Sequence, residues 1–396
     1  MKTNQTSLPI ILILILILAN LSQVVSDIYL PSLPFIAQAM KVSHSLVQLS
    51  LFSFMTGLAV AVLFSGLLSD AIGRKKPIIA GLIVCIIGSL ICISSHSIVI
   101  FNIGRALQGF GAGVAMSPGR AIFRDIFDGK KLAIMGSYLT IANIGIMTAA
   151  PFLGGYLQQW FNWHASFIFI TWYAIVTLVA VLWLLPETHQ YKHRDHIKPA
   201  VIKANLLTLA YSAVFIKSAF CIFFVFAAVF AWLTAGPVIL QVYYGLMPIE
   251  FGWFCVVIGI VFATGAFTNA RRLKKTAPEI QLRHGTCITI VSGILLVIGA
   301  LLPIHNALTI FIPILCFMFG ASWVFPNTYA VAMTPFGEIA GIATALLVCL
   351  QMLGAVFSSA LISLLPSHSA LPMGIAMLGF CLIAYWLAKG LHSVDF

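Results

Sequence analysis

Three charged residues lie within stretches of this sequence that are otherwise apolar or neutral. They are Asp27, Arg105 and Lys217. A charge in apolar surroundings is costly unless it is paired, hydrated or neutralised, so the presence of each one needs a reason. One acid and two bases embedded in a hydrophobic chain indicate a polar pathway through a membrane.

The composition defines the class of protein that must position these charges. Of the 396 residues, 61% are hydrophobic and 8% are charged, and the mean hydropathy is +1.07. Soluble domains carry about 25% charged residues, so a soluble globular domain is excluded. Apolar stretches of at least about 18 residues predict an all-α membrane protein with about twelve transmembrane helices. They are expected at 8–34, 45–69, 77–96, 98–119, 132–157, 163–185, 206–234, 250–270, 284–302, 306–330, 338–364 and 370–389.

The basic residues follow the alternation of these segments. Lys and Arg are concentrated in every second loop, at residues 74–76, 120–131, 192–203 and 271–283, whereas the opposite loops carry only Lys41 and a few His. This asymmetry predicts that both termini lie in the cytoplasm. The net charge of +11 then reflects topology and attraction to anionic lipid, and a nucleic-acid partner is not expected.

One polar stretch, residues 186–205, divides the chain. It predicts a cytoplasmic linker at 188–205 between two six-helix halves, at 1–187 and 206–396. A weak repeat supports this division, because a glycine precedes a polar residue by four positions, and basic residues follow, after the second and the eighth segments: Gly66, Asp70 and 74–76, then Gly265, Asn269 and 271–272. Duplicated halves with a central site are common in transporters.

The cysteines and the loops indicate no enzymatic or metal chemistry. Eight cysteines fall inside apolar segments without CxxC or Cys/His ligand spacing, at positions 85, 92, 221, 255, 287, 316, 349 and 381. They are interpreted as small buried packing residues, and no disulfide, metal site or cofactor is expected. The external loops are too short for a catalytic domain, so an enzyme is not expected.

The most specific motif is GLLSDAIGRKKP at residues 66–77. Gly66 permits close helix packing, Gly73 permits a tight turn, and a carboxylate at the membrane edge can pair with a base. The segment closely resembles the signature loop of the major facilitator superfamily. The resemblance implies that Gly66, Asp70, Gly73 and Arg74 form a cytoplasmic latch that stabilises the outward-open state.

Residues 103–112, IGRALQGFGA, resemble the fourth-helix motif of the same superfamily, whose arginine is implicated in proton coupling. The resemblance assigns that role to Arg105. The alternate glycines 109, 111 and 113 follow no strand and lie within an apolar segment, so we expect close helix packing here rather than a phosphate-binding loop.

The sequence APFLGG at residues 150–155 resembles the antiporter motif of the fifth helix. The resemblance places Pro151, Gly154 and Gly155 in a kinked, closely packed helix. Ala150 departs from the family pattern, which usually has glycine at this position, and this departure weakens the antiporter assignment slightly.

The first segment narrows the family. Its sequence DIYLPSLP at residues 27–34 resembles the Asp-x-Tyr-Leu-Pro-x-x-Pro pattern of Bcr/CflA-type drug:proton antiporters. Three places in the second half also resemble this subfamily: Gly236-Pro237, Phe325-Pro326-Asn327, and residues 341–345 with Gln351. The resemblance covers nearly the whole chain and implies a transporter driven by a proton gradient, which needs no cofactor.

Asp27 and Arg105 are the expected proton-coupling residues. At about 1.5 Å per helical residue, each lies roughly 10 Å below the outer face, so they share one depth. Burial favours the neutral form of a carboxyl group and a nearby cation favours the charged form, so opening and closing a cavity would change protonation. The alternative is a static structural ion pair. Gln23, one turn before Asp27, is placed to hydrogen-bond the carboxylate.

Lys217 is expected roughly 16 Å into the seventh segment, too deep to reach water along its own stem. It is interpreted as a cavity-lining cation that binds an anionic group or pairs with Asp27, and the alternative is a lysine without a role. Neutral cavity candidates, each weighed against plain helix packing, are Gln23, Tyr29, Tyr138, Asn143, Trp232, Gln241, Asn327 and Gln351. Aromatic walls suit loosely specified ligands.

Two functions remain open from these observations. The first is proton-coupled efflux of drugs or small metabolites by alternating access. The second is a dedicated carrier, exporter or importer, of one anionic metabolite such as a carboxylate siderophore, which Lys217 and the altered fifth-helix motif favour. In either case the expected partners are a small-molecule substrate, protons and the lipid bilayer. The chain is expected as a monomer in the inner membrane of a bacterium.

Overall fold

The computed structural model describes residues 8–127, 129–187, 199–303, 306–336, 339–366 and 369–391. Within these residues the regular structure is helical. Among the described residues, eleven helices are long and apolar enough to cross a membrane, and a further pair bent by 46° makes a broken twelfth span. The predicted all-α membrane fold with about twelve spans is confirmed.

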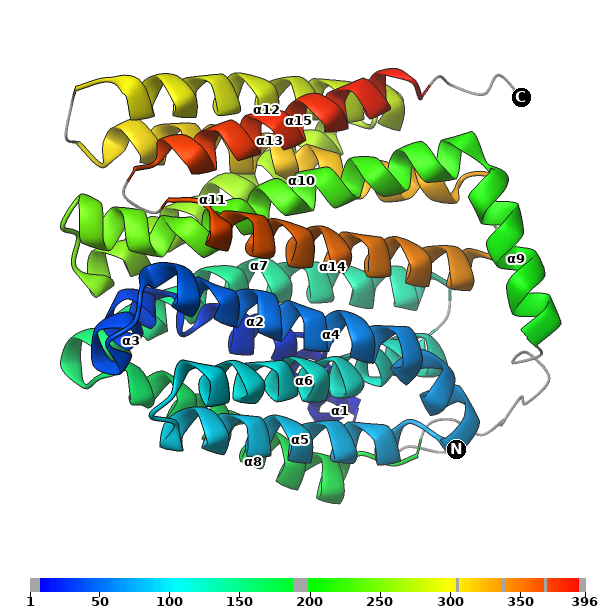
Figure 1. Ribbon diagram of the computed structural model, residues 1–396. Helices are drawn as coiled ribbons and strands as arrows, with labels where there is room; N and C mark the ends of the chain where they lie inside the picture. The colour runs from blue at the N-terminus through cyan, green and yellow to red at the C-terminus, as the bar shows by residue number, and fades with distance from the viewer. Residues whose placement is uncertain are drawn as a thin grey trace. The chain divides into compact units, whose positions relative to one another are not determined.

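Internal contacts divide the chain into two units. One comprises Met1–Val42 and Ser53–Lys198, and the other comprises Ser43–Phe52 and Pro199–Phe396. The helices up to residue 184 are α1 (Leu8–Ala19), α2 (Leu21–Asp27), the 3₁₀ turn η1 (Leu30–Ser32), α3 (Leu33–Met40), α4 (His44–Ile72), α5 (Lys75–Ser94), α6 (Ile98–Ile126), α7 (Gly129–Trp160) and α8 (Trp163–Leu184) (Figure 1).

The remaining helices belong to the second unit. They are α9 (Pro199–Tyr211), α10 (Ala213–Val238) with a π-helical turn at Ile239–Tyr243, α11 (Pro248–Arg272), α12 (Pro278–Leu301), α13 (Leu308–Met333), α14 (Ala340–Leu364) and α15 (Leu371–Lys389). Helix α9 runs at an angle to α10 in Figure 1. It includes residues that the sequence analysis placed in the linker, whose residues 188–198 lie outside the described part.

The first span differs from its prediction in length and continuity. It was expected to end at residue 34, but it continues to Met40 and is interrupted between α2 and α3. Pro31 and Pro34 each lie in the first turn of a new helical segment, η1 and α3 respectively. A proline in that position loses no helical hydrogen bond, so both prolines start segments instead of ending the span.

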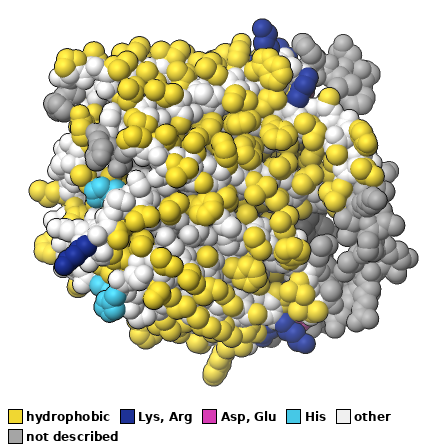
Figure 2. Space-filling model, viewed as in Figure 1, with side chains coloured by type: hydrophobic (Ala, Val, Ile, Leu, Met, Phe, Trp, Pro, Cys, Tyr) yellow, Lys and Arg dark blue, Asp and Glu magenta, His cyan; other side chains and the backbone are white. Residues whose placement is uncertain are grey.

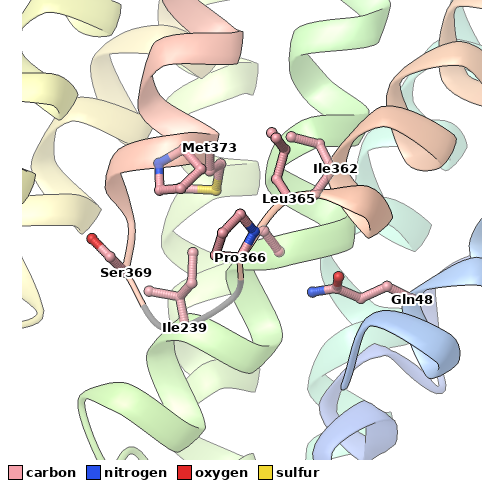
Figure 3. A pocket seen from close by; sticks show the side chains of 9 residues that line it. Gln48, Ile239, Ile362, Leu365, Pro366, Ser369 and Met373 are labelled. Atoms are coloured by element: carbon pink, nitrogen blue, oxygen red, sulfur yellow. The ribbon is translucent and has the colours of Figure 1, made fainter. Parts of the chain in front are cut away.

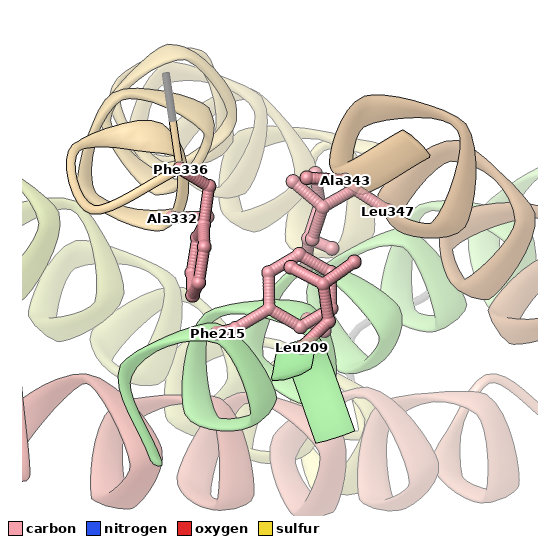
Figure 4. Close-up of a cluster of buried hydrophobic side chains, with 8 residues drawn as sticks. Leu209, Phe215, Ala332, Phe336, Ala343 and Leu347 are labelled. Carbon is pink, nitrogen blue, oxygen red and sulfur yellow. The ribbon is translucent and has the colours of Figure 1, made fainter. Parts of the chain in front are cut away.

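The seventh span also differs from its prediction, which began at residue 206. The helix is interrupted at Ser212, between α9 and α10. The Ser212 hydroxyl accepts a hydrogen bond from the backbone N–H of Phe215 at 3.3 Å and so caps α10. A cluster of buried apolar side chains from α9, α10, α13, the turn after α13, and α14 fixes this corner (Figure 4). The cluster consists of Leu209, Phe215, Ala219, Ile222, Ala332, Phe336, Ala343 and Leu347.

Helix α6 packs closely against both of its neighbours. A Cβ at Gly109 would collide with the backbone carbonyl of Phe54 in α4, and one at Gly111 would collide with the backbone of Cys85 in α5. Such contacts let helix backbones approach without intervening side chains. The expected role of these alternate glycines in helix packing is therefore confirmed.

The described surface is that of a protein surrounded by hydrocarbon. In Figure 2 hydrophobic side chains cover most of the visible face, and lysine and arginine side chains lie near its margins. On α8 the outward positions are large and apolar, with Trp172 62%, Val176 63% and Trp183 84% exposed. In water such a surface would favour aggregation, whereas in a bilayer it is the expected exterior.

Candidate functional site

Asp27 is the last residue of α2, at the point where the first span is interrupted. Its side chain is buried, with 2% exposed. The amide nitrogen of Gln23 donates to one carboxylate oxygen, as expected from its position one turn earlier, and the Ser26 hydroxyl lies 2.5 Å from the other. The Ser26 hydroxyl has a second acceptor, the backbone carbonyl of Gln23 at 3.1 Å. Both carboxylate oxygens are therefore held by neutral donors.

Arg105 of α6 is fully buried and reaches the same turn of α2. Its Nη1 donates to the backbone carbonyl of Val25 at 3.2 Å and to Oε1 of Gln108 at 2.6 Å. Its guanidinium carbon lies 4.0 Å from the ring centroid of Tyr29 and 4.5 Å from that of Phe54. The two aromatic faces offset part of the cost of burying this cation.

Gln108 extends the network from α6 to α5. Its amide nitrogen donates to the Ser89 hydroxyl at 2.7 Å, and that hydroxyl donates to the backbone carbonyl of Cys85 at 2.8 Å. The Gln108 side chain is thereby fixed with its oxygen toward Arg105. The arginine is positioned by α5, α6 and the aromatic rings, independently of the carboxylate.

The two predicted coupling residues share a site but do not form a pair. Among the described residues, Nε and Nη2 of Arg105 have no hydrogen-bond partner, and Nη1 bonds to Val25 and Gln108. The structure therefore shows no direct ion pair between these two described residues, and their role in proton coupling stays a prediction. Tyr29, expected to line a cavity, is fully buried and covers the guanidinium instead.

The fifth-helix motif packs against the turn that follows Asp27. An added Cβ at Gly154 of α7 would collide with the backbone carbonyl of Ile28, so no other residue fits without displacing that turn. The Ser166 hydroxyl of α8 donates to the same carbonyl at 3.5 Å. The expected close packing is confirmed for Gly154, and α7 continues through Pro151 as a single helix.

The loop between α4 and α5 forms a second polar cluster, around Arg74. Its Nε lies 2.9 Å from Oδ2 of Asp125 at the end of α6, and its Nη1 donates to the Ser69 hydroxyl at 2.7 Å. Gly73 has a φ of +97°, a conformation that favours glycine. The side chain of Asp70 and the surroundings of Gly66 are not among those that the structure describes.

Glu187, which follows α8, accepts hydrogen bonds from the start of α5. Its two carboxylate oxygens lie 2.8 Å from the backbone nitrogen of Arg74 and 3.2 Å from that of Lys75. Free N–H groups at a helix start favour an acid there. This Arg74 cluster, which consists of Arg74, Ser69, Asp125 and Glu187, thus joins α4, α5, α6 and the end of α8 through one cation and two acids.

The predicted cavity residues of the second unit mostly bond to their neighbours. The Asn327 amide donates to Oδ1 of Asn269 at 2.9 Å, Tyr329 donates to Oε1 of Gln351 at 2.8 Å, and Trp232 is 1% exposed. Gln241 is buried, and its amide atoms have no partner among the described residues. On α7, Tyr138 is 50% exposed and Asn143 is half-buried.

Lys217 does not lie at the predicted depth. It is the fifth residue of α10, because the span begins at Ala213 and not at residue 206. Its Nζ donates to the backbone carbonyl of Gly390, just beyond α15, at 3.0 Å, and Arg283 donates to the carbonyl of Leu391 at 2.6 Å. Cations bound to the last carbonyls of a helix stabilise its C-terminus. The observed contact of Lys217 is therefore structural.

A small cavity in the second unit is too small for a substrate (Figure 3). Its volume is about 10 Å³, room for about one water molecule. It is lined by Gln48, Ala235, Ile239, Ile362, Leu365, Pro366, Ser369, Pro372 and Met373. Both amide atoms of Gln48 are buried without a protein partner among the described residues, so a bound water fits this cavity.

Comparison with known proteins decides the family. The family model of the Major Facilitator Superfamily matches residues 15–359. The chain belongs to this superfamily. It is 30% identical to the bicyclomycin resistance protein homolog of Haemophilus influenzae over 390 residues, which cover 97% of this chain and 96% of the relative. It is 27% identical to multidrug resistance protein D of Escherichia coli, again covering 97% and 96%.

A solved structure of a D-xylose-proton symporter has the same fold as this superfamily member. The TM-score is 0.76 over 99% of this chain and 98% of the symporter, at 14% sequence identity. At this identity the likeness shows the fold alone. The predicted superfamily is confirmed, and the relatives named for bicyclomycin and multidrug resistance confirm the expected Bcr/CflA-type subgroup.

The two acids of the Arg74 cluster in this superfamily member were not predicted from the sequence. Asp125 follows Arg124 near the end of an apolar segment, and Glu187 follows Pro186 at the end of another. The chain has only ten acidic residues, so an acid at the end of a span is itself a signal. Their partner, Arg74, lies 51 positions from Asp125, and no local spacing rule joins them.

Replacing Asp125 with Asn is expected to weaken the Arg74 cluster and slow transport. A lost hydrogen bond to a charged group costs about 1.5–3 kcal/mol, and Arg74, 7% exposed, would lose its carboxylate partner. The unfolding temperature of the detergent-purified protein should fall, together with the initial transport rate. Lys76→Gln, an exposed change in the same loop, is the control and should affect neither. Unchanged unfolding of Asp125→Asn would contradict a stabilising role for this pair.

Proposed function

We propose that this chain is a proton-coupled secondary transporter that exports drugs or small metabolites from the cytoplasm by alternating access. The observation that supports it best is the buried Asp27 at a helix interruption, hydrogen-bonded by neutral donors and next to a separately held Arg105. The sequence similarity to proteins named for bicyclomycin and multidrug resistance supports the substrate class.

In this proposal Asp27 takes up and releases the coupled proton at a carboxylate oxygen. Burial favours the neutral acid, whereas hydrogen-bond donors and a nearby cation favour the carboxylate. A change in water access around the turn would therefore change which form is stable. Arg105 supplies a fixed positive charge, because Gln108 and the aromatic rings hold it without a carboxylate.

Two packing features would connect protonation to a change of conformation. Gly154 brings the backbone of α7 against Ile28, one residue after Asp27. Movement of the interrupted segment would therefore displace α7 directly, since no side chain lies between the two backbones. The Arg74 cluster would act as the latch that holds one end state until this movement occurs.

The dedicated carrier of one anionic metabolite loses its main support. That alternative depended on Lys217 as a mid-membrane cation, but this lysine lies near the start of its span and donates to Gly390. We propose a bacterial inner membrane location, with both termini in the cytoplasm and a single chain as the working unit. The distribution of basic residues supports this orientation.

Transport in inverted membrane vesicles with an imposed pH gradient tests the function. In such vesicles the cytoplasmic face is outside, so drug exporters accumulate substrate when the lumen is acidic. We expect accumulation of several chemically unrelated drugs, abolished by dissipation of the pH gradient. Accumulation of one anionic metabolite alone would favour the dedicated carrier. Accumulation that persists without a proton gradient would contradict proton coupling.

A further inference from the structure

The second unit carries a groove that neither Asp27 nor the Arg74 cluster uses. It has a volume of about 510 Å³, within the range of ligand sites, and its walls are mostly apolar. It is lined by Thr268 and Arg272 of α11, His284, Cys287 and Ile288 of α12, and Phe319 and Trp323 of α13. Cys287 is exposed, so the expectation that every cysteine is buried is wrong at this position.

The packing of three helices builds this groove. A Cβ at Gly265 of α11 would collide with the Ser322 hydroxyl, and one at Gly285 of α12 would lie 3.0 Å from the carbonyl of Gly320. Both helices therefore approach α13 closely, one on each side. Trp323, which is buried, forms the floor between them and donates through Nε1 to the Thr268 hydroxyl at 3.3 Å.

Positive charge is concentrated at the end of the groove where α11 ends. The guanidinium carbon of Arg272 lies 5.1 Å from the Trp323 ring centroid, and that of Arg271 lies 4.2 Å from the ring of Phe267. Residues 271–283 contain one acid, Glu279, and five basic residues: Arg271, Arg272, Lys274, Lys275 and Arg283. This end of the groove therefore attracts anions.

The corresponding basic loop of the first unit contacts two acids from other segments, Asp125 and Glu187. The two arginines at the end of α11, Arg271 and Arg272, have no such partner among the described residues. The repeat position of Asp70 is occupied by the neutral Asn269, which bonds to Asn327. The guanidinium donors of Arg271 and Arg272 are thus available to an external anion.

We propose that this groove binds an anionic phospholipid, with its phosphate at Arg272 and an acyl chain along Ile288 and Phe319. Helices α11, α12 and α13 are membrane spans, so acyl chains surround the groove. Guanidinium groups match phosphate oxygens in pairs, and basic pockets between transmembrane helices suit anionic headgroups. The proposal depends on the chain spanning a membrane and not on its substrate or direction of transport.

Native mass spectrometry of the detergent-purified full chain tests the site. Phosphatidylglycerol and phosphatidylcholine with identical acyl chains are titrated in parallel, and we expect about tenfold tighter binding of phosphatidylglycerol. Arg272→Gln should weaken phosphatidylglycerol binding about fivefold, because the headgroup loses its partner. Lys274→Gln removes one charge from the same loop but not from the groove, and it should change binding less than about twofold.

A second variant tests the acyl chain separately from the charge. Cys287→Trp places a large side chain at an exposed position of the groove wall and leaves the charge unchanged. It should weaken phosphatidylglycerol binding while the protein elutes as a single peak in size exclusion. Equal binding of the two lipids, or an equal loss in Lys274→Gln and Arg272→Gln, would overturn the proposal. Wild-type affinity in Cys287→Trp would overturn the placement of the acyl chain.

Discussion

Replacing Asp27 with Asn is expected to abolish uphill transport driven by a pH gradient, with accumulation falling to that of vesicles without the protein. Asparagine keeps the size of the side chain and can still accept from Gln23, but it cannot bind and release a proton. Transport is measured in inverted vesicles, and the amount of protein in the membrane is measured by immunoblot. Exchange of substrate down its own gradient should continue and lose its pH dependence.

The matched control for this variant is Glu279→Gln, which also converts an acid to its amide. Glu279 lies in the first turn of α12, which belongs to the second unit, whereas Asp27 belongs to the first. The control should transport like the wild type. Unimpaired uphill transport in Asp27→Asn would refute this residue as the proton site, whatever the behaviour of the control.

Arg105→Lys is expected to lower pH-driven transport about tenfold or more, although the positive charge is kept. A lysine ammonium cannot reproduce the flat guanidinium between the rings of Tyr29 and Phe54 or the pair of bonds to Val25 and Gln108. Lost hydrogen bonds to a charged group cost about 1.5–3 kcal/mol, which corresponds to a tenfold effect or larger. The initial rate of accumulation, normalised to protein in the membrane, is the measurement.

Arg271→Lys provides the comparison for Arg105→Lys, because Arg271 also lies over an aromatic ring but is exposed. A cation over an exposed ring contributes little, so this variant should retain wild-type transport. Tyr29→Phe, which keeps the ring face over Arg105, should also retain most of the rate, whereas Tyr29→Leu should not. Full activity of Arg105→Lys would show that charge alone, and not its fixed position, matters.

The sequence predicted the membrane fold well, because the cost of burying polar groups in hydrocarbon is a strong local constraint. The spans, and the hydrogen bond from Gln23 to Asp27, follow from hydropathy and from the one-turn spacing within a helix. The two helix interruptions, at the end of α2 and at Ser212, were not predicted. Ser212 and the end of α2 both lie inside stretches that were predicted as continuous spans, because an average over about 18 residues does not locate a break of one or two residues.

Contacts between distant segments could not be predicted from local patterns. Depth matching placed Asp27 and Arg105 together, but the preference of the guanidinium for the faces of Tyr29 and Phe54 depends on how α2, α4 and α6 meet. For Lys217 the predicted depth was wrong. The predicted span began at residue 206, which placed Lys217 near the membrane centre. In the structure α10 begins at Ala213, and the ammonium group of Lys217 caps the end of α15.

The two acceptors of the Ser26 hydroxyl have a consequence for how Asp27 can change its charge. When Asp27 is ionised, Ser26 donates to its Oδ1, and when Asp27 carries a proton on Oδ1, that proton can be donated to Ser26 while Ser26 donates to the carbonyl of Gln23. Gln23 donates to Oδ2 in both forms. One hydroxyl rotation thus keeps every donor in this trio paired on either side of the titration, so proton transfer itself leaves no broken hydrogen bond.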